Sequence, residues 1–190
     1  MSENNPILQV KDLTVSFNAF AGKVQAVRGV SFDLNKGETL CIVGESGSGK
    51  SVTNKAIMGI LSKNAVIDRG EILYDGMDLT KLTEEQFCQI RGKRIAMVFQ
   101  DPLSALNPIM KVGKQITETL CVHQKLSHEQ AKKRALELMA AVGIPEPEKR
   151  FNQYPFQFSG GMRQRIVIVI ALACNPEILI CDEPTTALDV

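Results

Sequence analysis

A glycine-rich octapeptide that ends in lysine and serine is the strongest chemical signal in this sequence. It reads GESGSGKS and fits the pattern G-x-x-x-x-G-K-[ST] of a phosphate-binding loop, or P-loop. Glycines let the backbone wrap closely around phosphate oxygens, and free N–H groups at the start of a helix supply positive potential. The residues predicted to bind a nucleotide here are Gly44, Glu45, Ser46, Gly47, Ser48, Gly49, Lys50 and Ser51.

Two side chains of this octapeptide have distinct predicted tasks. The Lys50 ammonium can reach the β- and γ-phosphates of ATP, and the Ser51 hydroxyl can bind Mg²⁺. The alternative is a glycine-rich turn that matches the pattern by chance. We favour the P-loop because the octapeptide lies between a predicted strand and a predicted helix, which is the context that the motif requires.

Two adjacent acids, Asp182 and Glu183, follow the apolar run at residues 178–181. A strand that ends in acids places carboxylates at the carboxyl edge of a sheet, where α/β folds bind ligands. We predict that Asp182 holds Mg²⁺, directly or through water, and that Glu183 polarises the water that attacks the γ-phosphate. The alternative is a solvated acidic turn, which the upstream P-loop makes less attractive.

A second candidate anion site is formed by Ser159, Gly160 and Gly161, which open a predicted helix. Their backbone N–H groups and the serine hydroxyl could bind phosphate. A lone Ser-Gly-Gly usually marks a flexible turn, but its place just upstream of the acidic strand makes this one specific. We therefore assign these three residues to nucleotide binding.

The elements that must position these groups follow from periodicity and capping. One folding unit is expected over residues 1–190, with a helical sub-lobe at 101–157 inserted between strands. Residues 166–174 (IVIVIALAC) are rich in β-branched side chains, which favours a strand, but their position favours a helix, and we predict a helix. Strands are predicted at 7–17, 24–34, 39–43, 71–74, 95–99 and 178–181, and helices at 51–61, 83–91 and 127–142, the last two opened by capping boxes.

Composition limits the remaining possibilities. The 190 residues carry a formal net charge of +1, so no basic surplus indicates nucleic-acid binding. Five cysteines without a CxxC pair indicate neither a disulfide framework nor a zinc site, and Cys41 and Cys181 are expected in the core. The N-terminus lacks the features of a signal peptide, and the longest apolar run is far shorter than the roughly 18 residues of a membrane span.

The ordered set of motifs resembles the ATPase subunits of ABC transporters over essentially the whole chain. The set comprises the P-loop, Gln100 after a strand, Ser-Gly-Gly and the segment DEPTTALD. Within the family, FQDPLSALNP at 99–108 and FSGGMRQR at 158–165 are similar to importer ATPases for oligopeptides, dipeptides and nickel. Most ABC proteins read LSGGQ, so Phe158 and Met162 depart from the general pattern and agree with this subgroup.

The resemblance implies a fold and further residue roles. The fold is an α/β P-loop NTPase, with a RecA-like core, an antiparallel β sub-lobe and a helical sub-lobe. Gln100 would sense the γ-phosphate, bind Mg²⁺ and link both to the membrane subunit, so Gln100, Lys50 and Glu183 form the catalytic set. Phe17 would stack on adenine, with an ordinary core position as the alternative. Asp189, within the D-loop region at 184–189, would face a partner subunit.

One departure from the family concerns the switch histidine on a strand after the D-loop. The sequence ends at Val190 before that strand, so we expect a C-terminally truncated domain whose own turnover is open. His123 and His128 fall in the helical sub-lobe, and we expect them to be solvated or structural.

The function implied by the resemblance is ATP hydrolysis that powers solute import, with peptide as the first choice of cargo and nickel or other solutes as alternatives. ATP and Mg²⁺ are the expected cofactors. A second ATPase subunit (identical or paralogous), permease subunits and, indirectly, an extracytoplasmic substrate-binding protein are the expected partners. The expected location is the cytoplasmic face of the inner membrane, as a peripheral protein. The alternatives are a soluble ABC ATPase outside transport and a nucleotide-binding fragment without turnover.

Overall fold

The computed structural model describes residues 6–20, 22–99, 101 and 105–183. The chain divides into two compact units, Met1–Cys88 and Gln89–Val190. Each unit is described by itself below, and the prediction of one domain over 1–190 with a sub-lobe at 101–157 stays a prediction.

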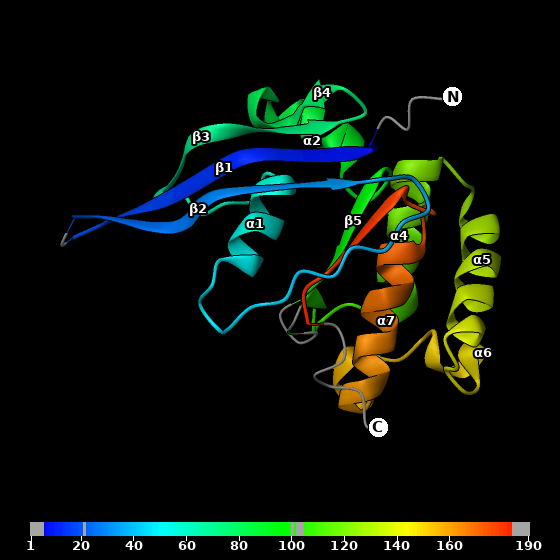
Figure 1. The fold of residues 1–190 in the computed structure, drawn as a ribbon. Helices are drawn as coiled ribbons and strands as arrows, with labels where there is room; N and C mark the ends of the chain where they lie inside the picture. Colours follow the sequence, from blue (N-terminus) through cyan, green and yellow to red (C-terminus); the bar gives the residue numbers. More distant parts are fainter. Residues whose placement is uncertain (1–5, 21, 100, 102–104, 184–190) are drawn as a thin grey trace. The chain divides into compact units, whose positions relative to one another are not determined.

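An antiparallel sheet forms most of the N-terminal unit (Figure 1). Its strand order is β2-β1-β3-β4, so β1 pairs with both β2 and β3. Alternation of apolar and polar residues predicted the first two strands, and the predicted strand at 71–74 forms the end of the longer β3. The strands are β1 Leu8–Ala19, β2 Gly22–Leu34, β3 Ala65–Tyr74 and β4 Met77–Asp78.

Helix α1, Lys50–Ile57, follows the glycine-rich octapeptide and buries Thr53, Ala56 and Ile57. It is shorter than the predicted helix at 51–61. Gly59 adopts a positive φ of 62°, and a Cβ atom there would lie 2.4 Å from the Phe87 ring. The chain therefore leaves the helix at a position where only glycine fits.

The predicted strand at 39–43 is not formed. These residues have no strand pairing among the described residues, and Val43 is 87% exposed. A buried strand needs neighbouring strands that hydrogen-bond to its N–H and C=O groups, and an apolar run alone does not supply them.

Two cysteines also differ from their predicted places. Cys41 is exposed, and so is Cys181 on strand 178–181, so the prediction that both fill the core is wrong.

Two short elements complete this part of the chain. The 3₁₀ helix η1, Leu79–Lys81, is capped by the Asp78 carboxylate, which accepts from the Thr80 N–H. Helix α2, Glu84–Ile90, begins with the predicted capping box: the Gln86 side chain accepts from the Thr83 N–H at 2.8 Å. The Thr83 hydroxyl accepts in return from the Gln86 N–H at 3.4 Å.

A parallel strand pair and a buried helix organise the C-terminal unit (Figure 1). Strand β5, Ile95–Val98, pairs with β6, Ile178–Cys181, as the sequence predicted. Helix α7, Gly160–Leu172, connects to β6 through a short turn and confirms the prediction of a helix over 166–174. It is apolar on nearly every side and buried, and burial overrides the β propensity of its side chains.

Helices α4, Val112–Gln124, and α5, His128–Ala141, pack beside α7 and form the core of this unit with it. The short helix α6, Pro147–Arg150, lies against α5 and buries no residue, and the 3₁₀ helix η2, Pro155–Gln157, precedes α7. The capping box predicted at Ser127 is present, with Gln130 as its partner. No helix in the described part of the chain has the length and apolar character needed to cross a bilayer. The core includes Ala96, Val98, Val112, Ile116, Leu120, Ala131, Ala135, Met139, Ile166, Val167 and Val169.

Candidate functional site

The Lys50 ammonium is held inside the octapeptide loop by backbone carbonyl groups. It donates to the Gly44 oxygen at 2.7 Å and to the Glu45 oxygen at 2.9 Å. Lys50 is the first residue of α1, and its side chain turns back along the loop that precedes the helix. The loop is therefore closed around a positive charge at a helix N-terminus, which is a favourable place for phosphate oxygens.

Gly49 forms the junction between the loop and α1. Its φ of 96° is left-handed, and a Cβ atom there would lie 2.6 Å from the Ala26 carbonyl oxygen and 3.2 Å from Val27 Cγ2. The backbone of β2 thus lies directly against the start of α1. Only glycine satisfies both the dihedral angle and the close approach at this position.

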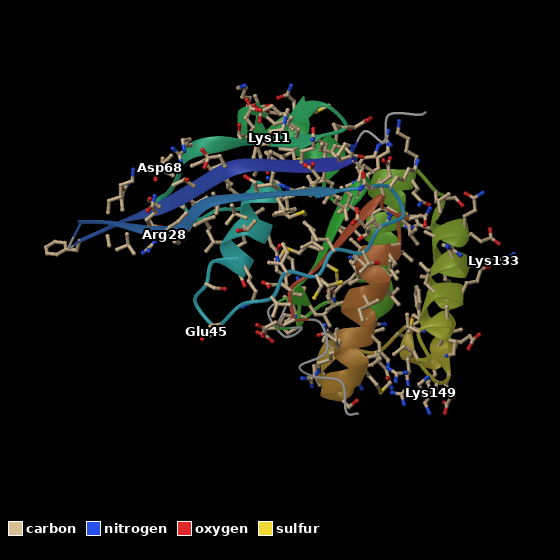
Figure 2. The ribbon with its side chains drawn as sticks, in the orientation of Figure 1. Lys11, Arg28, Glu45, Asp68, Lys133 and Lys149 are labelled. Atoms are coloured by element: carbon tan, nitrogen blue, oxygen red, sulfur yellow. The ribbon has the colours of Figure 1, made fainter. Side chains whose placement is uncertain are left out.

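The rest of the loop is compact and faces solvent. The Ser48 N–H donates to the Glu45 carbonyl at 3.2 Å, and Gly47 has a φ of 82°. A Cβ atom on Gly44 would lie 2.6 Å from the Ser48 hydroxyl oxygen, so a larger residue there would force the Ser48 side chain to move. Figure 2 shows Glu45 at the outer end of the loop. Ser46 is exposed on the same turn, so a ligand can reach the loop from solvent.

The first turn of α1 is fixed by Thr53. Its N–H and its hydroxyl both donate to the Gly49 carbonyl, at 2.9 Å and 3.0 Å. Ser51 lies half-buried in this turn, next to Lys50. The structure therefore brings the eight predicted nucleotide-binding residues together in one loop and one helix start.

The acidic pair lies at the carboxyl end of β6, as predicted. The Asp182 N–H donates to the Val98 carbonyl at 3.0 Å, which continues the β5–β6 ladder by one residue. Asp182 is 8% exposed, whereas Glu183 is exposed and has a φ of 48°. The left-handed backbone at Glu183 turns the chain directly after the buried acid, so the two carboxylates occupy different environments.

The Ser-Gly-Gly segment forms the start of α7 in the C-terminal unit. The Ser159 hydroxyl accepts from the Met162 N–H at 3.4 Å and caps the helix. A Cβ atom on Gly160 would meet nothing within 4 Å, so the approach to this helix end is open, and Gly161 follows in the first turn. Arg163 donates through Nε to the Pro155 carbonyl at 2.8 Å, which fixes the chain entering the helix.

The remaining predicted site residues are placed less completely. Phe17 is half-buried on β1, opposite Val24 on β2 and Ala65 on β3, so stacking on adenine and a core role stay open. Gln100 and the D-loop region at 184–189, including Asp189, lie outside the described residues. His123 is half-buried beside Gly92, and His128 is exposed at the start of α5, in line with structural or solvated roles.

The site residues fall into the two units. The P-loop and Phe17 belong to Met1–Cys88, whereas Ser159, Asp182 and Glu183 belong to Gln89–Val190.

The sequence did not predict the contact of Ala26 with Gly49, because no local pattern marks a close backbone approach between residues this far apart in the chain.

The oxygen donors present suit Mg²⁺. This ion prefers hydroxyl, carboxylate and phosphate oxygens over nitrogen or sulfur. The predicted ligands are the hydroxyl of Ser51, at the start of a helix, and the carboxylate of Asp182, at the end of a strand. The donor chemistry therefore fits the ion, and both residues are held by regular secondary structure.

Comparisons with known proteins give a consistent result. A family model described as "ABC transporter" matches residues 27–186. The oligopeptide transport ATP-binding protein OppD of Bacillus subtilis is 63% identical over 185 residues, covering 97% of this chain and 52% of that protein. The dipeptide transport ATP-binding protein DppD of Lactococcus lactis is 60% identical over 185 residues, covering 97% of this chain and 53% of that protein. The chain thus spans about half the length of these curated relatives.

Solved structures give the same result for the fold. The dimeric structure of MJ0796, a bacterial ABC transporter cassette, has a TM-score of 0.86 at 31% identity, covering 96% of this chain and 76% of that one. Another match is cbiO1 of Clostridium perfringens, part of the ABC transporter complex cbiONQ. Its TM-score is 0.76 at 29% identity, and the match covers 97% of this chain and 68% of that one. These likenesses confirm the predicted α/β P-loop NTPase fold with an antiparallel β sub-lobe and a helical sub-lobe.

Proposed function

The chain belongs to the ABC transporter family, and on this premise we propose that it binds and hydrolyses ATP to power the import of oligopeptides or dipeptides. The names of OppD and DppD, its relatives at 63% and 60% identity, support the choice of peptide. The choice of ATP is supported by the P-loop and by a solved relative that was captured after hydrolysis with ADP and phosphate.

The observation that carries this proposal is the pair of hydrogen bonds that the Lys50 ammonium donates to the carbonyl oxygens of Gly44 and Glu45. A cation already positioned at a helix start needs little rearrangement to receive a triphosphate. Backbone N–H groups at the start of α1 are further donors, and the cap residue Gly49 has no side chain that could bond to them. Binding through this loop is therefore pre-organised.

Hydrolysis needs positioning and charge neutralisation more than covalent chemistry. Lys50 and the loop N–H groups hold the β- and γ-phosphates, and Ser51, Gln100 and Asp182 are the side chains that would hold Mg²⁺. When bound, this ion neutralises phosphate charge. Glu183 orients the attacking water and accepts its proton, and the exposure of this residue to solvent supports that role.

A pair of such subunits would complete the site. In this arrangement, ATP on the P-loop of one subunit meets Ser159, Gly160 and Gly161 of the other, and Asp189 faces the partner. The open start of α7 supports this role, since it offers N–H groups to an anion. The dimeric structure of the relative MJ0796 supports a pair, which could be identical or paralogous.

The membrane partners follow from the same family. The protein would act at the cytoplasmic face of the membrane, bound to permease subunits, with a substrate-binding protein delivering cargo on the other side. Closure around ATP would reach the permease through the segment from Gln100 to Met110. We propose no role in nucleic-acid binding, because the net charge of +1 offers no basic surplus.

A Glu183→Gln variant of the intact protein, assembled with its membrane subunits in proteoliposomes, tests this function. We expect ATP binding to persist while ATP hydrolysis and peptide uptake fall about 10²- to 10⁴-fold, the usual contribution of a general base. Glu148→Gln, an exposed change on α6, is the matched control and should keep normal rates. A normal rate of ATP hydrolysis in the Glu183→Gln variant would contradict the assignment of Glu183 as the general base. ATP binding without turnover by the wild type would favour a nucleotide-binding protein instead.

A further inference from the structure

A groove of about 550 Å³ lies in the C-terminal unit, away from the residues assigned to nucleotide. Helix α4, the start of α5 and the segment after α6 line it, through residues that include Lys114, Glu118, Val122, Lys132 and Phe151. Its size is within the range of about 300–1,000 Å³ that is usual for binding sites. We call it the α4–α5 groove.

The walls of the α4–α5 groove are fixed by backbone contacts. The Gly113 N–H donates to the Phe151 carbonyl and the Val112 N–H donates to the Gln153 carbonyl, both at 2.9 Å. The Phe151 ring covers Gly113 so closely that a Cβ atom there would lie 2.4 Å from it. Phe151 is therefore locked against the first turn of α4, and the groove is pre-formed.

Apolar surface in this groove is exposed to solvent. Val122, on α4, is 66% exposed, and Phe151 and Cys121 are half-buried. These side chains come from two separate segments and together form an apolar strip. An apolar strip with a charged border is typical of a surface that receives another molecule.

The border of the groove is positively charged. Lys111, Lys114 and Lys132 line it against one carboxylate, Glu118, although the whole chain carries a net charge of only +1. Within the described residues, no carboxylate forms an ion pair with these three lysines. The Lys132 ammonium lies 5.8 Å from the centre of the Phe151 ring, so this cation borders the apolar strip. Among the residues that the structure describes, these lysines therefore offer a ligand positive charge that no carboxylate neutralises.

We propose that the α4–α5 groove binds an acidic amphipathic helix of a partner protein. Apolar side chains of that helix contact Phe151 and Val122, and its carboxylates pair with Lys114 and Lys132. Helix-in-groove binding is a common mode for a channel between two helices. Glu118 on α4 favours a peptide over an anionic lipid surface, because a peptide can place a neutral or basic residue beside this carboxylate. The proposal does not rest on nucleotide binding or on the segment from Gln100 to Met110.

The test uses a fluorescently labelled synthetic peptide with leucines at i, i+4 and i+7 and glutamates beside them, titrated into the intact protein. We expect saturable binding that weakens as salt is added. The double variant Lys114→Glu/Lys132→Glu should weaken binding by about tenfold or more, because it replaces attraction with repulsion. Lys133→Glu is the matched control: Figure 2 shows Lys133 on the side of α5 away from α4, and binding should stay within about twofold.

The apolar half of the proposal has its own variant. Val122→Asp should weaken peptide binding by about tenfold, whereas Val24→Asp, at a similarly exposed position on β2, should leave it unchanged. A peptide with glutamine in place of glutamate should bind weakly to the wild type. Circular dichroism and thermal unfolding of each variant identify any that fail to fold, and Lys114→Gln/Lys132→Gln then takes the place of the double glutamate variant.

Three results would overturn the proposal. The peptide could fail to bind with saturation, or Lys133→Glu could weaken binding as much as the double variant. The third result concerns vesicles of phosphatidylglycerol and phosphatidylcholine: lysine-dependent binding to them without peptide binding would identify a lipid surface instead. None of these outcomes depends on ATP, so failure here is separate from failure of the proposed function.

Discussion

Gly49 lies so close to Ala26 that a Cβ atom on this glycine would come within 2.6 Å of the Ala26 carbonyl oxygen. The contact joins the P-loop to β2 and explains why the loop needs glycine here for space as well as for dihedral angle. We expect Gly49→Ala to destabilise the protein by about 2 kcal/mol or more and to weaken ATP binding. Urea unfolding and an ATP titration measure the two effects.

Gly37→Ala is the control for this prediction. Gly37 also has a positive φ, of 78°, but a Cβ atom there would meet nothing within 4 Å. Its replacement should therefore cost only the backbone strain, about 1 kcal/mol, and leave ATP binding intact. Equal losses of stability at both glycines would show that the approach of Ala26 is unimportant.

Asp68, on β3, makes the stability of the N-terminal sheet depend on pH. Hydrogen bonds from Lys23 and Ser16 hold the pKa of its carboxyl below the ordinary value. A depressed folded-state pKa stabilises the fold above the unfolded pKa of about 3.9 and loses that contribution as pH falls through the lower folded value. We expect Asp68→Asn to be less stable than the wild type at pH 7, with a difference that closes as the pH approaches 3.

Urea unfolding between pH 7 and about pH 2.5 measures this effect, because the difference closes only below the unfolded pKa of about 3.9. Figure 2 shows Asp68 on the antiparallel sheet, where the residue is exposed to solvent. Asp33→Asn on β2, whose carboxylate accepts from the Gln9 amide at 3.3 Å, provides the comparison. A stability difference for Asp68→Asn that is constant across this range would contradict the role given to the Lys23 pair.

Gln164 is the buried polar side chain of α7. It is 1% exposed, and neither its amide nitrogen nor its amide oxygen has a partner among the described residues. An unpaired buried amide costs about 1–3 kcal/mol, so Gln164→Leu should leave the free energy of unfolding unchanged or raise it. Thermal and urea unfolding measure the change, and a loss above about 1 kcal/mol would mean that the amide is paired outside the described residues.

Local patterns predicted the elements that local forces determine. The octapeptide ending at Lys50 and Ser51 predicted the loop and the start of α1, and the capping boxes at Thr83 and Ser127 predicted two helix starts. Each signal lies within a few residues of the structure that it specifies, since a cap or a glycine turn needs no distant partner. The acids after β6 were predictable for the same reason.

Features that depend on distant partners were not predictable. The apolar run at 39–43 resembles a buried strand, but a strand also needs a neighbour, and the sequence does not say whether one is in place. The contact of Gly49 with Ala26 and the α4–α5 groove bring together segments that no motif connects. Tertiary packing creates both, and a single sequence does not encode it in a readable pattern.

The most direct measurement for the central claim is a titration of Mg-ATP into the intact protein carrying Lys50→Ala. The Lys50 ammonium lies on the Gly44 and Glu45 carbonyls, and its loss removes the charge that receives the phosphates. We predict that ATP affinity falls at least about tenfold, as expected for a charge-assisted contact, while Lys55→Ala at the other end of α1 binds ATP normally. Unchanged ATP affinity in Lys50→Ala would contradict the assignment of this loop as the nucleotide site.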